Sequence, residues 1–126
     1  MKTAISTLSA PQAIGPYSQA IKAGGFLFLS GQIPLDPTTG TLVDGDISAQ
    51  TRRVLDNIRE VLSAAGCGFS SVVKTSIFLT DLGDFVTVNG IYAEYFLAPF
   101  PARSTFQVAA LPKGSRIEIE VVASLA

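Results

Sequence analysis

Hydrophobic residues recur along this chain with a helical period in some segments and an extended period in others. Between 47 and 65 the apolar positions repeat as one buried stripe of a helix, with most charged side chains outside it. Asp46 or Ser48 is placed to cap the start of this helix. A second stripe from 84 to 96, with Asp84 placed as its cap, predicts another helix.

Six shorter segments show the alternation, or the β-branched and aromatic enrichment, of strands. Gly24 and Gly25 separate two of them and favour a tight hairpin, because glycine adopts positive φ without strain. The last segment alternates strictly, so Glu118 and Glu120 share one face and the apolar residues share the other. The segments are 2–6, 20–23, 26–30, 72–79, 103–111 and 116–125.

The order of these elements is β-β-β-α-β-α-β-β, which predicts a single α+β domain over residues 1–126. Two helices with one apolar stripe each are expected to lie on one face of a single sheet. Apolar residues make up 48% of the chain, and its mean hydropathy is +0.42. This surplus favours a neighbouring subunit over water on the other face. A dense core with few surface charges is the alternative.

The composition excludes several functional classes. The chain has no histidine, which rules out imidazole metal sites and Ser–His or Cys–His catalytic pairs. A formal net charge of -1, with 15% charged residues, argues against nucleic acid as a partner. Cys67 is the one cysteine, so no internal disulfide can form. No apolar run approaches the ~20 residues of a membrane span, and we expect a cytoplasmic protein with no membrane contact.

Three charged residues are candidates for chemistry. Arg103 stands where a proline-stiffened loop enters a strand, and its planar fork matches a carboxylate with two parallel hydrogen bonds. The spacing alone favours an ordinary surface arginine or a structural ion pair. Glu118 and Glu120 point the same way, either as a solvated strand face or with one of them as a general base or water-positioning group.

Several polar residues stand at element boundaries or on the second helix. Tyr17 and Ser30 lie next to glycine or proline, where they offer short polar contacts to a ligand or simply form turns. Asn89 is a ligand contact or a plain polar position. Tyr92 and its aromatic neighbours fit the buried stripe, and Cys67 fits a structural role.

Four ordered blocks carry a resemblance that covers essentially the whole chain. They are Ile14-Gly15-Pro16-Tyr17-Ser18-Gln19-Ala20, Leu29-Ser30-Gly31-Gln32-Ile33-Pro34, Phe100-Pro101-Ala102-Arg103-Ser104, and the run from Val108 to Glu120. Together they resemble the hallmark motifs of the RidA (YjgF) family, the reactive-intermediate imine deaminases.

The resemblance implies a fold, an assembly and an activity. The fold would be the chorismate-mutase-like α+β fold, with one mixed sheet and the helices on one face. Members are homotrimers whose sheets form a central barrel, with the ligand sites in clefts between subunits. The activity would be hydrolysis of 2-imino acids or their enamines, such as 2-iminobutanoate and 2-iminopropanoate, to 2-oxo acids and ammonia. No cofactor is implied, and the imines come from pyridoxal-phosphate-dependent dehydratases.

The resemblance also assigns roles to residues. Arg103 matches the arginine that binds the substrate carboxylate, and Glu118 matches the acidic residue that positions or activates water. Thr105 stands where many members have cysteine, at a position used partly through its backbone. The remaining pocket contacts match Tyr17, Ser30, the Gly31 backbone and Asn89.

Two other functions fit the same residues. A non-catalytic module that binds small carboxylates would use the same arginine. A ribonuclease or translation inhibitor, a label that some members of the family carry, fits less well, because the chain has neither a histidine acid–base pair nor a basic excess.

Overall fold

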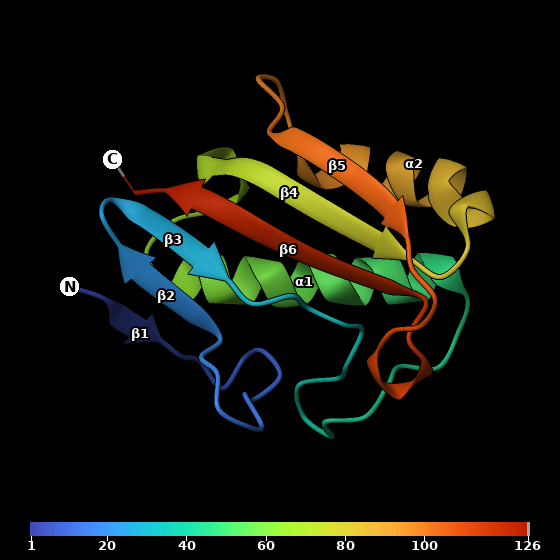
Figure 1. The fold of residues 1–126 in the computed structure, drawn as a ribbon, viewed down its shortest axis with the longest axis horizontal. Coiled ribbons are helices and arrows are strands. Elements are labelled where there is room, and N and C mark those ends of the chain that lie inside the picture. The colour runs from blue at the N-terminus through green and yellow to red at the C-terminus, as the bar shows by residue number, and fades with distance from the viewer. Residues whose placement is uncertain (126) are drawn as a thin grey trace.

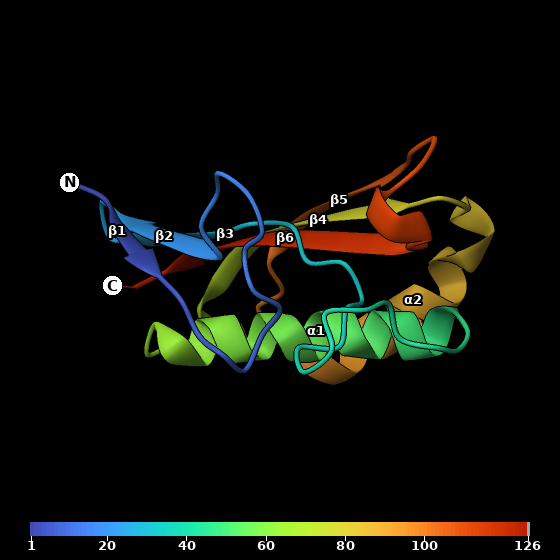
Figure 2. The ribbon, with the colours of Figure 1, turned by 90° about the horizontal axis from the view of Figure 1, so that it is seen from below.

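The computed structural model describes residues 1–125 and shows one six-stranded sheet with both α-helices on the same face (Figures 1 and 2). The helices and strands are β1 (Thr3–Ile5), β2 (Ala20–Ala23), β3 (Phe26–Leu29), α1 (Ile47–Ala64), β4 (Val72–Leu79), α2 (Phe85–Tyr95), β5 (Ala102–Gln107) and β6 (Ile117–Ser124). Short 3-10 turns η1 (Phe69–Ser71), η2 (Leu82–Asp84) and η3 (Pro112–Gly114) join them. The predicted α+β order is confirmed.

The strands lie in the order β1-β2-β3-β6-β4-β5, so the last strand of the chain sits in the middle of the sheet (Figure 1). All neighbouring strands are antiparallel except β4 and β5, which are parallel. A parallel pair needs a crossover connection, and α2 supplies it. Gly24 and Gly25 form the predicted hairpin with φ of 58° and 80°.

The core lies between the sheet and the two helices. Its sheet side is formed by alternate residues of β4 and β6, among them Ile77 and Ile119, which pair across the two strands and are fully buried. Its helix side is the predicted stripe of α1, with Val54, Ile58 and Leu62 fully buried. Neither helix within residues 1–125 combines the length and the apolar character needed to cross a membrane.

The two predicted helix caps have different outcomes. The Asp46 carboxylate accepts a hydrogen bond from the backbone N–H of Ala49 at 3.0 Å and caps α1. The prediction for Asp84 is wrong, because its side chain makes no capping bond at α2. Both its oxygens instead accept hydrogen bonds from Arg116, at 2.9 and 3.0 Å, which ties the start of α2 to the start of β6.

The sheet face opposite the helices, here called the open face, carries aromatic and acidic side chains. Phe28 and Phe106 are 47% and 54% exposed, and Phe106 stacks on Phe78 with ring centroids 6.3 Å apart. Glu118 pairs with Phe78, and Glu120 pairs with Ser76. Four exposed or partly exposed phenylalanines on one sheet face are unusual for a surface that contacts water: Phe26, Phe28, Phe78 and Phe106.

Candidate functional site

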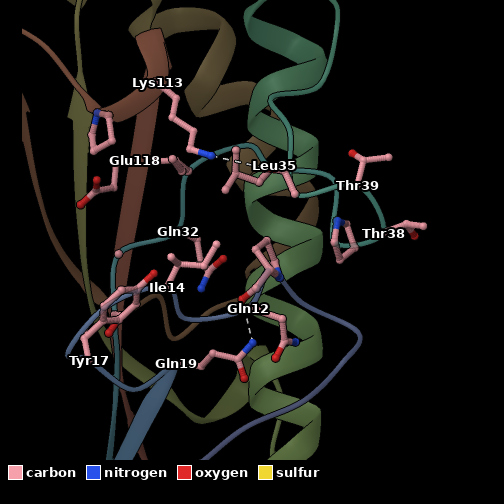
Figure 3. A pocket seen from close by; sticks show the side chains of 17 residues that line it. Gln12, Ile14, Tyr17, Gln19, Gln32, Leu35, Thr38, Thr39, Lys113 and Glu118 are labelled. Atoms are coloured by element: carbon pink, nitrogen blue, oxygen red, sulfur yellow. Dashed lines mark hydrogen bonds between the residues drawn. The ribbon is translucent and has the colours of Figure 1, made fainter.

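A cavity of about 760 Å³ lies between the 11–19 segment, the 30–40 loop and the 112–118 segment (Figure 3). We call it the Glu118 pocket. Tyr17, Ser30, Gly31 and Glu118 all line it. The structure therefore brings together four of the residues that the sequence nominated, from segments up to a hundred positions apart.

Glu118 is half-buried in this pocket, on β6. Burial raises the pKa of its carboxyl group above the ordinary glutamate value, and the nearby charge of Glu120 raises it further. Within residues 1–125 its carboxylate has no hydrogen-bond or ion-pair partner. A partnerless carboxylate with a raised pKa is a stronger proton acceptor when ionised, as a general base requires.

Gly31 makes room for the Glu118 side chain. A Cβ atom at position 31 would lie 2.8 Å from the Cδ atom of Glu118, closer than real side chains approach each other. Gly31 does not have a positive φ, so backbone freedom is not the reason for glycine here. The carboxylate of Glu118 keeps its position because residue 31 has no side chain.

Ser30 and Tyr17 complete the polar lining of the Glu118 pocket. The Ser30 hydroxyl donates a hydrogen bond of 2.6 Å to the carbonyl oxygen of Ser18, so its oxygen is free to accept but its proton is already used. Tyr17 is 54% exposed at the margin of the pocket (Figure 3). The backbone N–H of Tyr17 donates a hydrogen bond of 2.9 Å to the carbonyl oxygen of Gly15, which holds the turn before Tyr17.

Arg103 lines a separate cavity of about 420 Å³, here called the Arg103 cavity. Its guanidinium lies over the rings of Tyr92 and Phe85, 4.9 and 5.3 Å from their centroids. Its Nη1 group donates a hydrogen bond of 2.8 Å to the side-chain oxygen of Asn89. Within residues 1–125 no carboxylate pairs with Arg103, which excludes the structural ion pair considered above. The guanidinium keeps most of its donors for a ligand.

The three contacts of Arg103 come from one face of α2. Phe85, Asn89 and Tyr92 are spaced i, i+4 and i+7, which places them in one row along a helix. The sequence nominated Asn89, but Phe85 and Tyr92 were both assigned to the buried stripe of the helix. The sequence alone therefore shows that these three residues share one side of the helix. What it could not show is that β5 would run beside this helix.

Arg103 and Glu118 lie on opposite faces of the sheet. Arg103 pairs in register with Thr75, which is fully buried on the helix-covered face. Thr105 pairs with Ile77 and shares that face. Glu118 pairs with Phe78 on the open face. One chain therefore holds two half-sites and does not bring its candidate carboxylate anchor to its candidate base.

Two further sequence expectations concern metals and thiols. Among residues 1–125 no cluster of three or more histidine, cysteine, aspartate or glutamate side chains could hold a metal ion. Burial raises the pKa of the Cys67 thiol, and its Sγ atom donates to the Leu62 carbonyl at 3.5 Å. A protonated thiol in a packed turn agrees with the structural role assigned to it.

Comparison with known proteins agrees with this fold and these motifs. A human protein named 2-iminobutanoate/2-iminopropanoate deaminase is 54% identical over 98% of this chain and 90% of its own length. The structure of YyfA, a Rid-family protein from Yersinia pestis, superposes with a TM-score of 0.96 at 55% identity, covering 98% of this chain and 99% of that one. Escherichia coli TdcF with bound serine superposes with a TM-score of 0.93 at 41% identity, covering 97% and 98%.

These matches confirm the family resemblance and the fold predicted from four sequence blocks. The family profile described as Endoribonuclease L-PSP matches residues 7–125, almost the whole chain. The chain belongs to the Endoribonuclease L-PSP family, which the Rid-type motifs around Tyr17, Ser30, Arg103 and Glu118 had indicated.

Proposed function

We propose that this protein hydrolyses 2-imino acids and their enamine tautomers, such as 2-iminobutanoate and 2-iminopropanoate, to 2-oxo acids and ammonia. The observation that carries the proposal is the pair of half-sites with complementary charges. A guanidinium without an ion pair suits the carboxylate of the substrate, and a carboxylate without a partner suits the protonated imine. The name of the human relative supports the same activity.

The chemistry needs few groups. A protonated imine is already electrophilic, so neither a metal nor a covalent nucleophile is required. Glu118 accepts a proton as a water oxygen adds to the imine carbon. Glu118 then returns this proton to the nitrogen of the carbinolamine and takes up the hydroxyl proton as the C–N bond breaks, which releases ammonia and leaves the 2-oxo acid; the proton on Glu118 finally passes to the ammonia as ammonium. Arg103 holds the carboxylate throughout, and Thr105, two residues further along the same edge strand, offers its backbone to the ligand.

The proposal includes a homotrimer in which one subunit supplies Arg103 and its neighbour supplies Glu118. The opposite placement of the two residues supports this, because a small imino acid cannot reach both faces of one sheet. The exposed phenylalanines of the open face support it as well. Pyridoxal-phosphate-dependent dehydratases, which release such imines, are the expected suppliers of substrate.

A non-catalytic carboxylate-binding module is the second candidate. It is favoured by the structure of the Escherichia coli relative with bound serine, a carboxylate that is not an imine. The same Arg103 cavity would serve such a ligand. RNA cleavage is the weakest reading despite the family description, because the chain has no histidine and a net charge of -1.

The test couples the purified protein to a threonine dehydratase and traps the released imine with semicarbazide. We expect the wild type to lower semicarbazone formation and to speed the appearance of 2-oxobutanoate. Arg103→Ala should lose roughly 30-fold or more in kcat/KM, because charged hydrogen bonds to the carboxylate are lost. Arg52→Ala, which removes a surface ion pair with Glu94, is the matched control.

The outcomes separate the candidates. If Arg103→Ala relieves trapping as well as the wild type does, Arg103 is not the carboxylate anchor. If the wild type binds 2-oxobutanoate but leaves the lifetime of the imine unchanged, the protein is a binding module and not a deaminase.

A further inference from the structure

A buried hydrogen bond lies directly behind the Arg103 cavity. The hydroxyl groups of Thr75, on β4, and Tyr92, on α2, are 2.9 Å apart. Thr75 is fully buried and Tyr92 is 5% exposed. Thr75 is also the register partner of Arg103 on the neighbouring strand. Two hydroxyl groups are thus sequestered in the core beside a candidate binding residue, where an apolar pair of the same shape would pack without a desolvation cost.

The bond fixes the ring of Tyr92 in place. The ring stacks on Phe96 with centroids 4.3 Å apart on the core side. The guanidinium of Arg103 lies over the same ring, 4.9 Å from its centroid. Burial raises the pKa of Tyr92, against smaller opposing effects of the Thr75 hydrogen bond and the Arg103 charge, so its hydroxyl stays neutral and bonded.

Arg103 depends on this ring for its orientation. It is an exposed residue on β5, one of the two edge strands of the sheet, and its side chain has many rotamers to lose on ordering. Within residues 1–125 its side chain is held by the Tyr92 and Phe85 rings and by one hydrogen bond to Asn89. The hydrogen bond to Asn89 fixes the Nη1 atom of Arg103, and the two rings beneath the guanidinium set the plane of the group.

We propose that Tyr92, anchored by Thr75, is a positioning residue that holds the Arg103 fork in the plane that receives the substrate carboxylate. The proposal rests on the function proposed above, in which Arg103 binds that carboxylate. Tyr92 does not touch the reacting atoms. Its effect is to reduce the conformational freedom that Arg103 would otherwise lose when a carboxylate binds.

The test removes the hydroxyl pair and keeps the ring. Tyr92→Phe and Thr75→Val each delete the same bond with little change in shape. We expect each to raise KM, and the Kd for 2-oxobutanoate measured by calorimetry, by about fivefold with kcat changed by less than about twofold. The double variant should be no weaker than either single variant, because only one bond is lost.

Tyr95→Phe is the matched control. Tyr95 lies on the same helix, and its hydroxyl donates a hydrogen bond of 3.0 Å to Asp56. The contacts of Arg103 are Phe85, Asn89 and Tyr92, and they include neither residue. The control should lose a comparable amount of thermal stability and keep the wild-type KM and Kd. This comparison separates positioning from a general loss of packing.

Failure of this inference can be told apart from failure of the proposed function. If the wild type hydrolyses the imine, but Tyr92→Phe matches Tyr95→Phe in KM and Kd or loses only kcat, the positioning role is wrong and the function stands. If the wild type neither hydrolyses the imine nor binds 2-oxobutanoate, the proposed function is wrong, and the positioning role that rests on it is wrong as well.

Discussion

Burying Glu118 costs the folded state stability, and the proposed function gives that burial a chemical purpose. Burial raises the pKa of its carboxyl group in the folded protein, so ionisation disfavours the folded state. This penalty is absent below the unfolded-state pKa of about 4.3, grows as pH rises through the folded-state pKa, and is constant above it. A residue kept for catalysis is expected to show this conflict between stability and function.

Glu118→Gln should therefore unfold at a higher temperature than the wild type at pH 7, with a difference that shrinks to nothing as pH falls to about 4. The measurement is thermal unfolding followed by circular dichroism across this pH range at one protein concentration. A lower melting temperature for Glu118→Gln at pH 7 would show that the carboxylate is stabilised by contacts other than those described.

Gly31 is expected to matter through the space it leaves. In Gly31→Ala the new methyl group would overlap the end of the Glu118 side chain, which is flexible and moves away at little cost. Imine hydrolysis should fall about tenfold or more, because the displaced carboxylate no longer holds the water, while the melting temperature changes little. Gly68→Ala, where a Cβ meets nothing within 4 Å, is the control. Full activity in Gly31→Ala would remove Glu118 from the mechanism.

At the scale of elements, the features that depend on local sequence were predictable. The stripe of α1 and the hairpin at Gly24 and Gly25 follow from residues close together in the chain, and both were predicted within a residue or two. The strand order was not predictable, because β6 enters between β3 and β4 through pairings distant in sequence. The prediction of an Asp84 cap was wrong for the same reason. The Asp84 carboxylate binds Arg116 instead of the helix backbone, and Arg116 lies 32 positions away in the sequence.

The candidate site shows the same limit. Alternation placed Glu118 and Glu120 on one face but did not choose between them. In the structure Glu118 lines a pocket half-buried, while Glu120 is exposed. Tyr92 looked like core and is core, yet its ring also contacts Arg103. Hydrophobic periodicity shows which side of a helix is buried, but it does not show which strand, distant in sequence, lies against that side.

The aromatic open face gives a prediction for β5. Phe106→Asp places a charge among exposed phenylalanines that the proposed trimer would bury. Light scattering should find the wild type at three times the 13.2 kDa chain mass, and the variant at one, with imine hydrolysis lost alongside. Leu8→Asp, at a residue 86% exposed on the N-terminal segment, should keep the wild-type mass. A Phe106→Asp variant that remains trimeric would place the interface elsewhere.

At the scale of the whole molecule, the fold separates two groups that the proposed reaction must bring together. Arg103 lies on the helix-covered side of the edge strand, and Glu118 lies on the open face of a central strand. A closed ring of identical subunits joined through unlike surfaces would bring the Arg103 cavity of each to the Glu118 pocket of the next. Assembly would then be a condition of activity.

The most direct test of this shared site is to mix two variants that are each strongly impaired. Arg103→Ala and Glu118→Gln subunits are unfolded together in equal amounts and refolded into mixed assemblies. A site built across subunits regains both groups at about a quarter of the interfaces, so about a quarter of the wild-type rate of imine hydrolysis should return. Each variant refolded alone should keep only its own low residual rate. If assemblies shown to contain both variants recover no activity, the shared site is contradicted. Either Arg103 and Glu118 of one chain would then act in the same site, or one of them would not belong to the site.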